Sequence, residues 1–201
     1  MYGTPVNTFF KDEFPASFWE DYNSATELWL IGVTMAGTIK YSVIEEKLKK
    51  GHTVKVMLVH PDGPAIEIAE NRMYGRVDVL RRRRDTLSNL LDMCELKRVT
   101  SGKLEIRTIQ NPLTYEAVVV NPASAAGTMY LKHYVFKLMS PQGTKPKFVL
   151  RAADGYWYEF FKKELTNLWE CGSEWKCEGR TISRDDESSV KESSEPKYAV
   201  Q

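Results

Sequence analysis

Two short apolar runs near the start of the chain, separated by an amphipathic stretch, set the first pattern. The runs cover residues 28–33 and 54–59, and both are rich in residues that favour strands. Between them, apolar residues recur at helical spacing, and Gly51 stands where such a helix would end. This order predicts a strand, a helix and a second strand parallel to the first, with both strands buried.

The remaining pattern predicts a long helical region, further strands and a closing helix. The helical region covers residues 64–96 and is expected to break near Gly75. Alternation and apolar runs then predict strands at 103–109, 115–120, 128–138 and 148–150, and a helix at 156–169. Together these elements predict an α/β fold, a mixed sheet flanked by helices on both faces.

Two sets of apolar residues are predicted to pack on the sheet, because each follows the three- and four-residue spacing of a helix face. They are Val77, Leu80, Leu87, Leu91 and Cys94 in the long helical region, and Trp157, Phe160, Phe161, Leu165 and Leu168 in the last helix.

The two ends of the chain differ from the middle in composition. Residues 1–23 are aromatic, with Phe14, Phe18 and Tyr22 four apart, and they predict a short helical segment that packs on the domain. A partner-binding patch is the alternative. Residues 180–201 are polar and rich in charge and serine, which predicts a disordered tail. The α/β domain itself is expected at 24–179.

Composition and charge restrict the environment more than the chemistry. The formal net charge of +1 indicates neither a nucleic-acid binder nor a binder of acidic ligands, so any binding site must come from a local cluster. Three cysteines do not make a disulfide framework, and Cys171 and Cys177 are predicted to be free thiols in a reducing compartment. No apolar run reaches the roughly 20 residues that span a bilayer. These features predict a cytoplasmic protein without membrane contact.

Four consecutive arginines, at 81–84, form the strongest charge cluster. Neighbours on a helix lie about 100° apart, so the four cannot share one face. Arg84, with Arg76, is expected on the apolar side of the helix. Arg82 is a further candidate for the binding site. Three interpretations remain open: an ion pair with an internal acid such as Glu116, a pocket for phosphate or carboxylate, and a solvated patch.

His60 and Asp62 follow the second parallel strand, and ligands of open parallel sheets bind beyond such strand ends. A turn is the default interpretation of His60 to Gly63, and a catalytic His60 with Asp62 is the alternative. The three histidines show no metal-ligand spacing, and the glycines form no nucleotide-binding motif, so neither a metal site nor a cofactor is predicted.

The order of elements resembles one half of the phospholipase D-like fold, and more narrowly a bacterial phospholipase D-like family of unknown function, some members of which are fused to DNA-binding regulators. The stretches that carry the resemblance are LWLIGVTM, LKKGHTVKVMLVHPDGPA, the arginines before Leu87, KLEIRTIQNPLTYEAVVVN and FVLRAADGYWYEFFKKELTNLWE.

Active members of that superfamily carry His-x-Lys-x4-Asp, but here Thr114, Glu116 and Asn121 stand at the three positions. Thr114 lacks the nucleophilic imidazole, and Glu116 repels a phosphodiester that a lysine would attract. The resemblance therefore implies the fold, a non-catalytic site and self-association, since intact enzymes join two halves.

The leading hypothesis is a non-catalytic domain that binds an anionic or phosphate-bearing ligand, or a protein partner. The predicted site residues are His60, Asp62, Arg82, Arg84, Thr114, Glu116 and Asn121. One alternative is a divergent phosphodiesterase or nuclease that acts as a homodimer through His60 or His133, with nucleic acid as its partner. Another is a regulatory module whose aromatic N-terminus and polar tail recruit partners.

Overall fold

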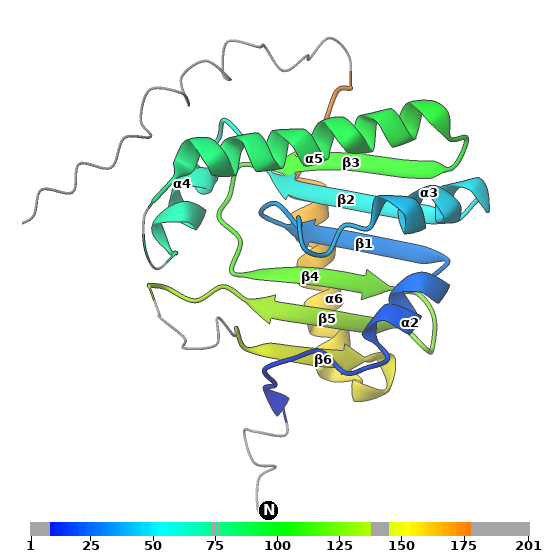
Figure 1. The fold of residues 1–201 in the computed structure, drawn as a ribbon. Coiled ribbons are helices and arrows are strands. Elements are labelled where there is room, and N and C mark those ends of the chain that lie inside the picture. Colours follow the sequence, from blue (N-terminus) through cyan, green and yellow to red (C-terminus); the bar gives the residue numbers. More distant parts are fainter. Residues whose placement is uncertain (1–8, 74, 76, 138–144, 178–201) are drawn as a thin grey trace, which may run out of the picture.

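A computed structural model describes residues 9–73, 75, 77–137 and 145–177. Within them, seven strands form one mixed sheet in the order β6-β5-β4-β1-β2-β3-β7 (Figure 1). Helices cover both faces of the sheet, so the predicted α/β class is confirmed. The predicted tail at 180–201 lies outside the described residues.

The predicted strand-helix-strand unit is present. It consists of β1 (Glu27–Gly32), α3 (Tyr41–Lys49) and β2 (Thr53–Val59), and the two strands are parallel. Both strands are almost wholly buried, as their continuous apolar runs predict. Gly51 follows α3 with a φ of 76°, a conformation that favours glycine and ends the helix.

The other strands extend this unit in two directions. On one side, β3 (Lys103–Ile109) is parallel to β2, and the two-residue β7 (Ser173–Glu174) is antiparallel to β3. On the other side, β4 (Tyr115–Val120) is antiparallel to β1. β5 (Thr128–His133) and β6 (Lys147–Arg151) continue the antiparallel half. All six residues of β4 are buried, as expected for a central strand.

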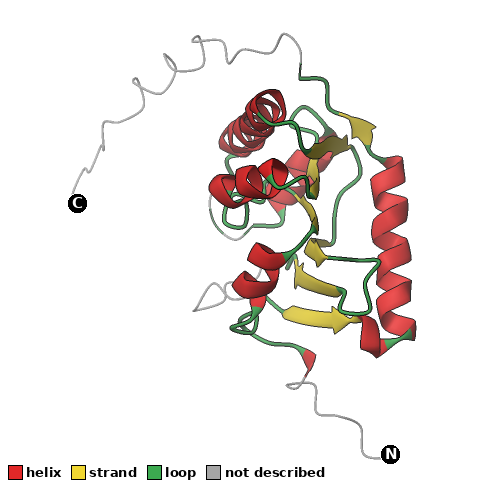
Figure 2. Ribbon diagram, turned by 90° about the vertical axis from the view of Figure 1, so that its right-hand side faces the viewer, coloured by secondary structure: helices red, strands yellow, loops and turns green. Residues whose placement is uncertain are grey.

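The helices divide between the two faces of the sheet. α2 (Phe18–Ser24), α3 and α5 (Val79–Val99) lie on one face, where Phe18 and Tyr22 are buried. α4 (Pro64–Asn71) and α6 (Tyr156–Cys171) contribute to the second core, and α6 crosses the strands of that face (Figure 2). A single turn of 3-10 helix, η1 (Ala152–Asp154), leads into α6.

Both predicted helix stripes are confirmed only in part: Cys94 of α5 and Leu165 of α6 are buried, and Leu87, Phe161 and Leu168 pack against the core. In α5 the buried residues include Leu90 and Met93, whereas Leu80 is 69% exposed. In α6, Tyr158, Leu165 and Trp169 are buried, whereas Trp157 is 57% exposed. Apolar residues surround much of α6, so spacing alone could not identify the side that meets the sheet. The first turns of α5 lie beside α4, which explains why the stripe does not begin at Leu80 (Figure 1).

The prediction that Cys177 is a free thiol is also wrong. Cys177 forms a disulfide with Cys94 of α5, across 83 residues of sequence, and Cys171 remains free and exposed. Trp175, which lies between Cys171 and Cys177 in the sequence, is buried in the core beneath α5. The disulfide removes the argument for a reducing compartment, because that argument depended on unpaired cysteines. Among the described helices, none has the length and apolar character needed to cross a membrane.

Candidate functional site

A cavity of about 280 Å³ lies at the edge of the sheet where β1 ends and β4 begins. Residues 33–37, which follow β1, form one wall, and Glu116 near the start of β4 lies at the same edge because the two strands are antiparallel. Ligands of open α/β sheets bind beyond the carboxyl ends of parallel strands, and this cavity has that position relative to β1. Among its described lining residues, four are cationic, Arg72, Arg82, Lys132 and Lys145, and Glu116 is the one acid.

Glu116 is buried and has two partners. Lys132 Nζ lies 2.6 Å from its Oε2, and the Thr38 hydroxyl donates a hydrogen bond of 2.7 Å to its Oε1. Lys132 is the direct cross-strand neighbour of Glu116 in the β4–β5 pair. Such a pair compensates the buried carboxylate, which alone would be very unfavourable. The expected internal acid is therefore present, but its cation is Lys132 and not one of the arginines.

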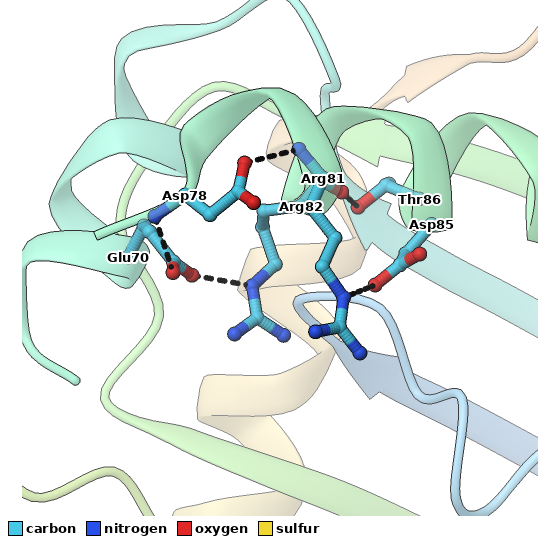
Figure 3. Close-up of polar contacts among 6 residues, drawn as sticks. All are labelled: Glu70, Asp78, Arg81, Arg82, Asp85 and Thr86. Atoms are coloured by element: carbon cyan, nitrogen blue, oxygen red, sulfur yellow. Dashed lines mark hydrogen bonds and ion pairs between the residues drawn. The ribbon is translucent and has the colours of Figure 1, made fainter. Parts of the chain in front are cut away.

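Arg82 reaches the cavity from the first turns of α5. Its Nε lies 2.8 Å from Oε2 of buried Glu70, and Oε1 of Glu70 accepts a hydrogen bond from the backbone N–H of Asp78. Asp78 in turn caps α5 by accepting from the N–H of Arg81 at 2.9 Å. Figure 3 shows the two terminal nitrogens of Arg82 directed away from Glu70. The network fixes the guanidinium by one edge and leaves its fork for a ligand.

Arg84, by contrast, is exposed and does not line the cavity, so its predicted place on the apolar side is wrong. Two residues along a helix correspond to about 200°, and Arg82 has the inward position. Arg84 was placed on the apolar side because the predicted apolar stripe included Leu80, which is exposed in the structure. Arg83 pairs with Glu67 on the surface, and Arg76 lies outside the described residues.

Arg72 and Tyr134 hold the rim of the cavity together. Arg72 Nη1 donates to the carbonyl of Leu113 at 2.6 Å, and the Tyr134 hydroxyl accepts from the N–H of Val33 at 3.1 Å. Burial, reinforced by the nearby Glu116 carboxylate, raises the pKa of Tyr134 far above its ordinary value. Tyr134 is therefore a neutral phenol, and its hydroxyl proton remains available for an acceptor.

Lys145 is the fourth cationic residue that lines the cavity. Its Nζ lies 5.4 Å from the ring centroid of Tyr134. Burial lowers the pKa of Lys145, and repulsion from Lys132 lowers it further. A lowered lysine pKa means that the positive charge is poorly compensated where it stands. An incoming anion would supply that compensation.

Three other predicted residues lie outside the cavity lining. His60 and Asp62 follow β2, where the N–H of Asp62 donates to Nδ1 of His60 at 3.2 Å and the His60 ring lies 5.7 Å from that of Trp175. Thr114 is exposed, and its carbonyl accepts from the N–H of Tyr134. The predicted turn is the local structure at His60.

Asn121 lies at the opposite end of β4 from the cavity. Its Oδ1 accepts from the N–H and hydroxyl of Thr26 and from the N–H of Glu27, at 2.9 to 3.0 Å. Its φ is 47°, in the left-handed region. This side chain holds the entry to β1, and among the seven predicted site residues the structure brings only Arg82 and Glu116 to the cavity.

Sequence reasoning missed Thr38, Arg72, Lys132, Tyr134 and Lys145. Lys132 carried a usable signal, because a hairpin between the strands at 115–120 and 128–133 places it opposite Glu116. Arg72 follows α4, and Lys145 precedes β6. Single charged residues are common at such positions and carry no such signal.

No protein-family model and no curated protein matches the chain. Among the solved structures that do match, two are similar at a TM-score of 0.47 and 12% identity over 78% of this chain. One is TrmBL2, an archaeal chromatin protein with a novel mode of DNA binding, and this chain spans about half its length, 47%. The other is NUC from Salmonella typhimurium, a phospholipase D family member, of which 87% is covered. Similarity at this level carries no argument about family or function.

Proposed function

We propose that this chain is a phospholipase D-like domain whose cavity binds a phosphate-bearing or other anionic ligand without transforming it. The observation that carries the proposal is the charge of the cavity. Glu70 pairs with Arg82 and Glu116 pairs with Lys132, and the positive charges of Arg72 and Lys145 remain after these pairings.

The groups that line the cavity suit the oxygens of such a ligand. The fork of Arg82 can donate two parallel hydrogen bonds to a phosphate or carboxylate, and lysine adds a compact charge. The neutral hydroxyl of Tyr134 can donate as well. Because the cavity is partly enclosed, each of these interactions is stronger than it would be on an open surface.

The same geometry favours binding over catalysis. Neither His60 nor His133 lines the cavity among its described residues, and Thr114, at the position of the superfamily's histidine, does not line it either. Glu116, at the position of the superfamily's lysine, is already paired with Lys132. The cavity therefore offers charge and hydrogen bonds without an imidazole nucleophile.

Matched arginine variants test the proposal. Calorimetric titration of the wild type with phosphate in low salt should detect binding, and Arg82→Gln should weaken it by roughly tenfold or more through loss of a charge-assisted contact. The glutamine amide can still donate to Glu70. Arg84→Gln removes an equal charge two residues away and should change the affinity less than about twofold. Absence of phosphate binding, or equal effects of the two variants, would overturn the proposal.

Turnover provides the second test. The protein is expected to leave bis-p-nitrophenyl phosphate and DNA intact. Hydrolysis by the wild type that disappears in His60→Ala or His133→Ala would replace the binding proposal by the phosphodiesterase alternative.

A further inference from the structure

A second cavity, also about 280 Å³, lies next to the first. Lys132 lines both cavities. Thr38 lines the second, and its hydroxyl donates to Glu116, which lines the first. The boundary between the two cavities is therefore made by side chains of this one hydrogen-bonded group, Thr38, Glu116 and Lys132.

The second cavity differs from the first in its aromatic wall, which α2 and the residues before it provide. Phe14 stacks on Phe18 with ring centroids 4.9 Å apart, and Trp19 meets Phe18 edge-on at 4.7 Å. Phe18 is 6% exposed, whereas Trp19 is 42% exposed. Phe18 thus belongs to the core, whereas Trp19 retains apolar surface that another flat ring could cover.

Cations lie at the aromatic wall as well. Lys40 Nζ lies 5.2 Å from the ring centroid of Trp19, and Lys147 Nζ lies 5.9 Å from that of Phe14. Lys147 is also 3.2 Å from Glu13 Oε2, so part of its charge is already compensated. Among the described lining residues of the second cavity, the two cations Lys132 and Lys147 already have acid partners, Glu116 and Glu13, so this cavity suits a neutral planar ring better than a second anion.

We infer that the two cavities bind one ligand, a phosphate monoester that carries a planar aromatic ring, such as a nucleoside monophosphate. This inference rests on the proposed function. The phosphate lies among Arg82, Lys132 and Lys145, and the ring lies against Trp19. Lys132, shared by both cavities, marks where the two parts of the ligand join.

Three ligands separate the contributions of phosphate and ring: AMP, ribose 5-phosphate, which lacks the ring, and adenosine, which lacks the phosphate. AMP is expected to bind the wild type about tenfold more tightly than ribose 5-phosphate, since stacking of a base on an aromatic side chain is worth about that factor or more. Adenosine is expected to bind more weakly than both.

Trp19→Leu should abolish the advantage of AMP and leave the affinity for ribose 5-phosphate unchanged. Trp157→Leu is the matched control, because Trp157 is similarly exposed but lies on α6, which covers the other face of the sheet. This control should alter neither affinity. In the wild type, the indole N–H resonance of Trp19 should shift with AMP and not with ribose 5-phosphate, a readout that requires no variant.

The outcomes distinguish the two proposals. Equal affinities for AMP and ribose 5-phosphate, or an AMP advantage that survives Trp19→Leu, would overturn the inference and leave the anion site standing. Failure of both phosphate ligands to bind would overturn both proposals.

Discussion

The two ends of β4 carry polar side chains that serve different purposes. At the Val120 end, the carboxamide oxygen of Asn121 accepts three hydrogen bonds from Thr26 and Glu27. At the Tyr115 end, Glu116 is paired with Lys132, but Arg72 and Lys145 add charge that the neighbouring acids do not balance. Both ends are polar, and among the described residues that line the cavity at the second end, cations outnumber acids.

This difference teaches how a binding edge can be separated from a structural one. A group whose hydrogen-bonding capacity is met inside the protein stabilises the fold and has little left for a ligand. A cluster of partly desolvated like charges is unfavourable alone and becomes favourable when an anion enters. The relevant measure is therefore uncompensated charge, not the number of polar residues.

The largest expected effect is on stability, at the Asn121 end. Asn121→Ala removes the acceptor of three hydrogen bonds. It also leaves an alanine at a positive φ, which asparagine tolerates better than alanine does. It should lower the free energy of unfolding by about 2–4 kcal/mol, measured by urea denaturation. Phosphate affinity should not change.

Asn121→Gly separates the two causes, because glycine tolerates the positive φ but offers no acceptor. It should recover part of the loss. A phosphate affinity that falls in either folded variant would contradict the assignment of this end to structure.

The next effect concerns binding at the other end. Lys145→Met removes an uncompensated cation, so sulfate affinity at pH 7 should fall roughly tenfold, or about 1.4 kcal/mol, while stability stays the same or rises slightly. Titration calorimetry measures the first quantity and urea denaturation the second. An unchanged affinity would show that Lys145 does not contribute to the anion site.

The pH dependence of the same variant has a defined sign. Burial lowers the pKa of Lys145, so its ammonium group loses its proton at a lower pH than an ordinary lysine. Sulfate stays a dianion throughout, so wild-type sulfate affinity should fall as the pH rises through that lowered pKa. The decrease should be smaller in Lys145→Met. An increase with pH in the wild type would contradict this explanation.

The smallest effect is expected from Glu116. Glu116→Gln keeps an acceptor for Thr38 and releases Lys132 from its counter-ion, so phosphate affinity should rise about threefold. Glu67→Gln removes an exposed acid that pairs with Arg83 outside the cavity, and it should leave the affinity unchanged. A weaker phosphate affinity in Glu116→Gln would indicate that Glu116 orients Lys132 toward the ligand.

Local patterns in the sequence determined most elements of this fold, although the strand predicted at 128–138 ends at His133 in the structure. The strands predicted at 103–109 and 115–120 have those bounds in the structure, because an apolar or alternating run between turn residues is a short-range signal. The parallel unit at the start of the chain followed from the same signals. The rule that ligands bind beyond the ends of parallel strands pointed to His60 and Asp62 after β2, whereas the cavity lies beyond β1 and neither residue lines it.

Tertiary structure alone decided which side chains meet there. Spacing along a helix fixes the relative positions of residues but not which side faces the sheet, so it chose Arg84 where the structure places Arg82. The disulfide between Cys94 and Cys177 and the convergence of Arg72 with Lys145 join segments far apart in sequence. Such contacts depend on strand order and helix docking, which are set by the packing of the whole chain and leave no short-range signal.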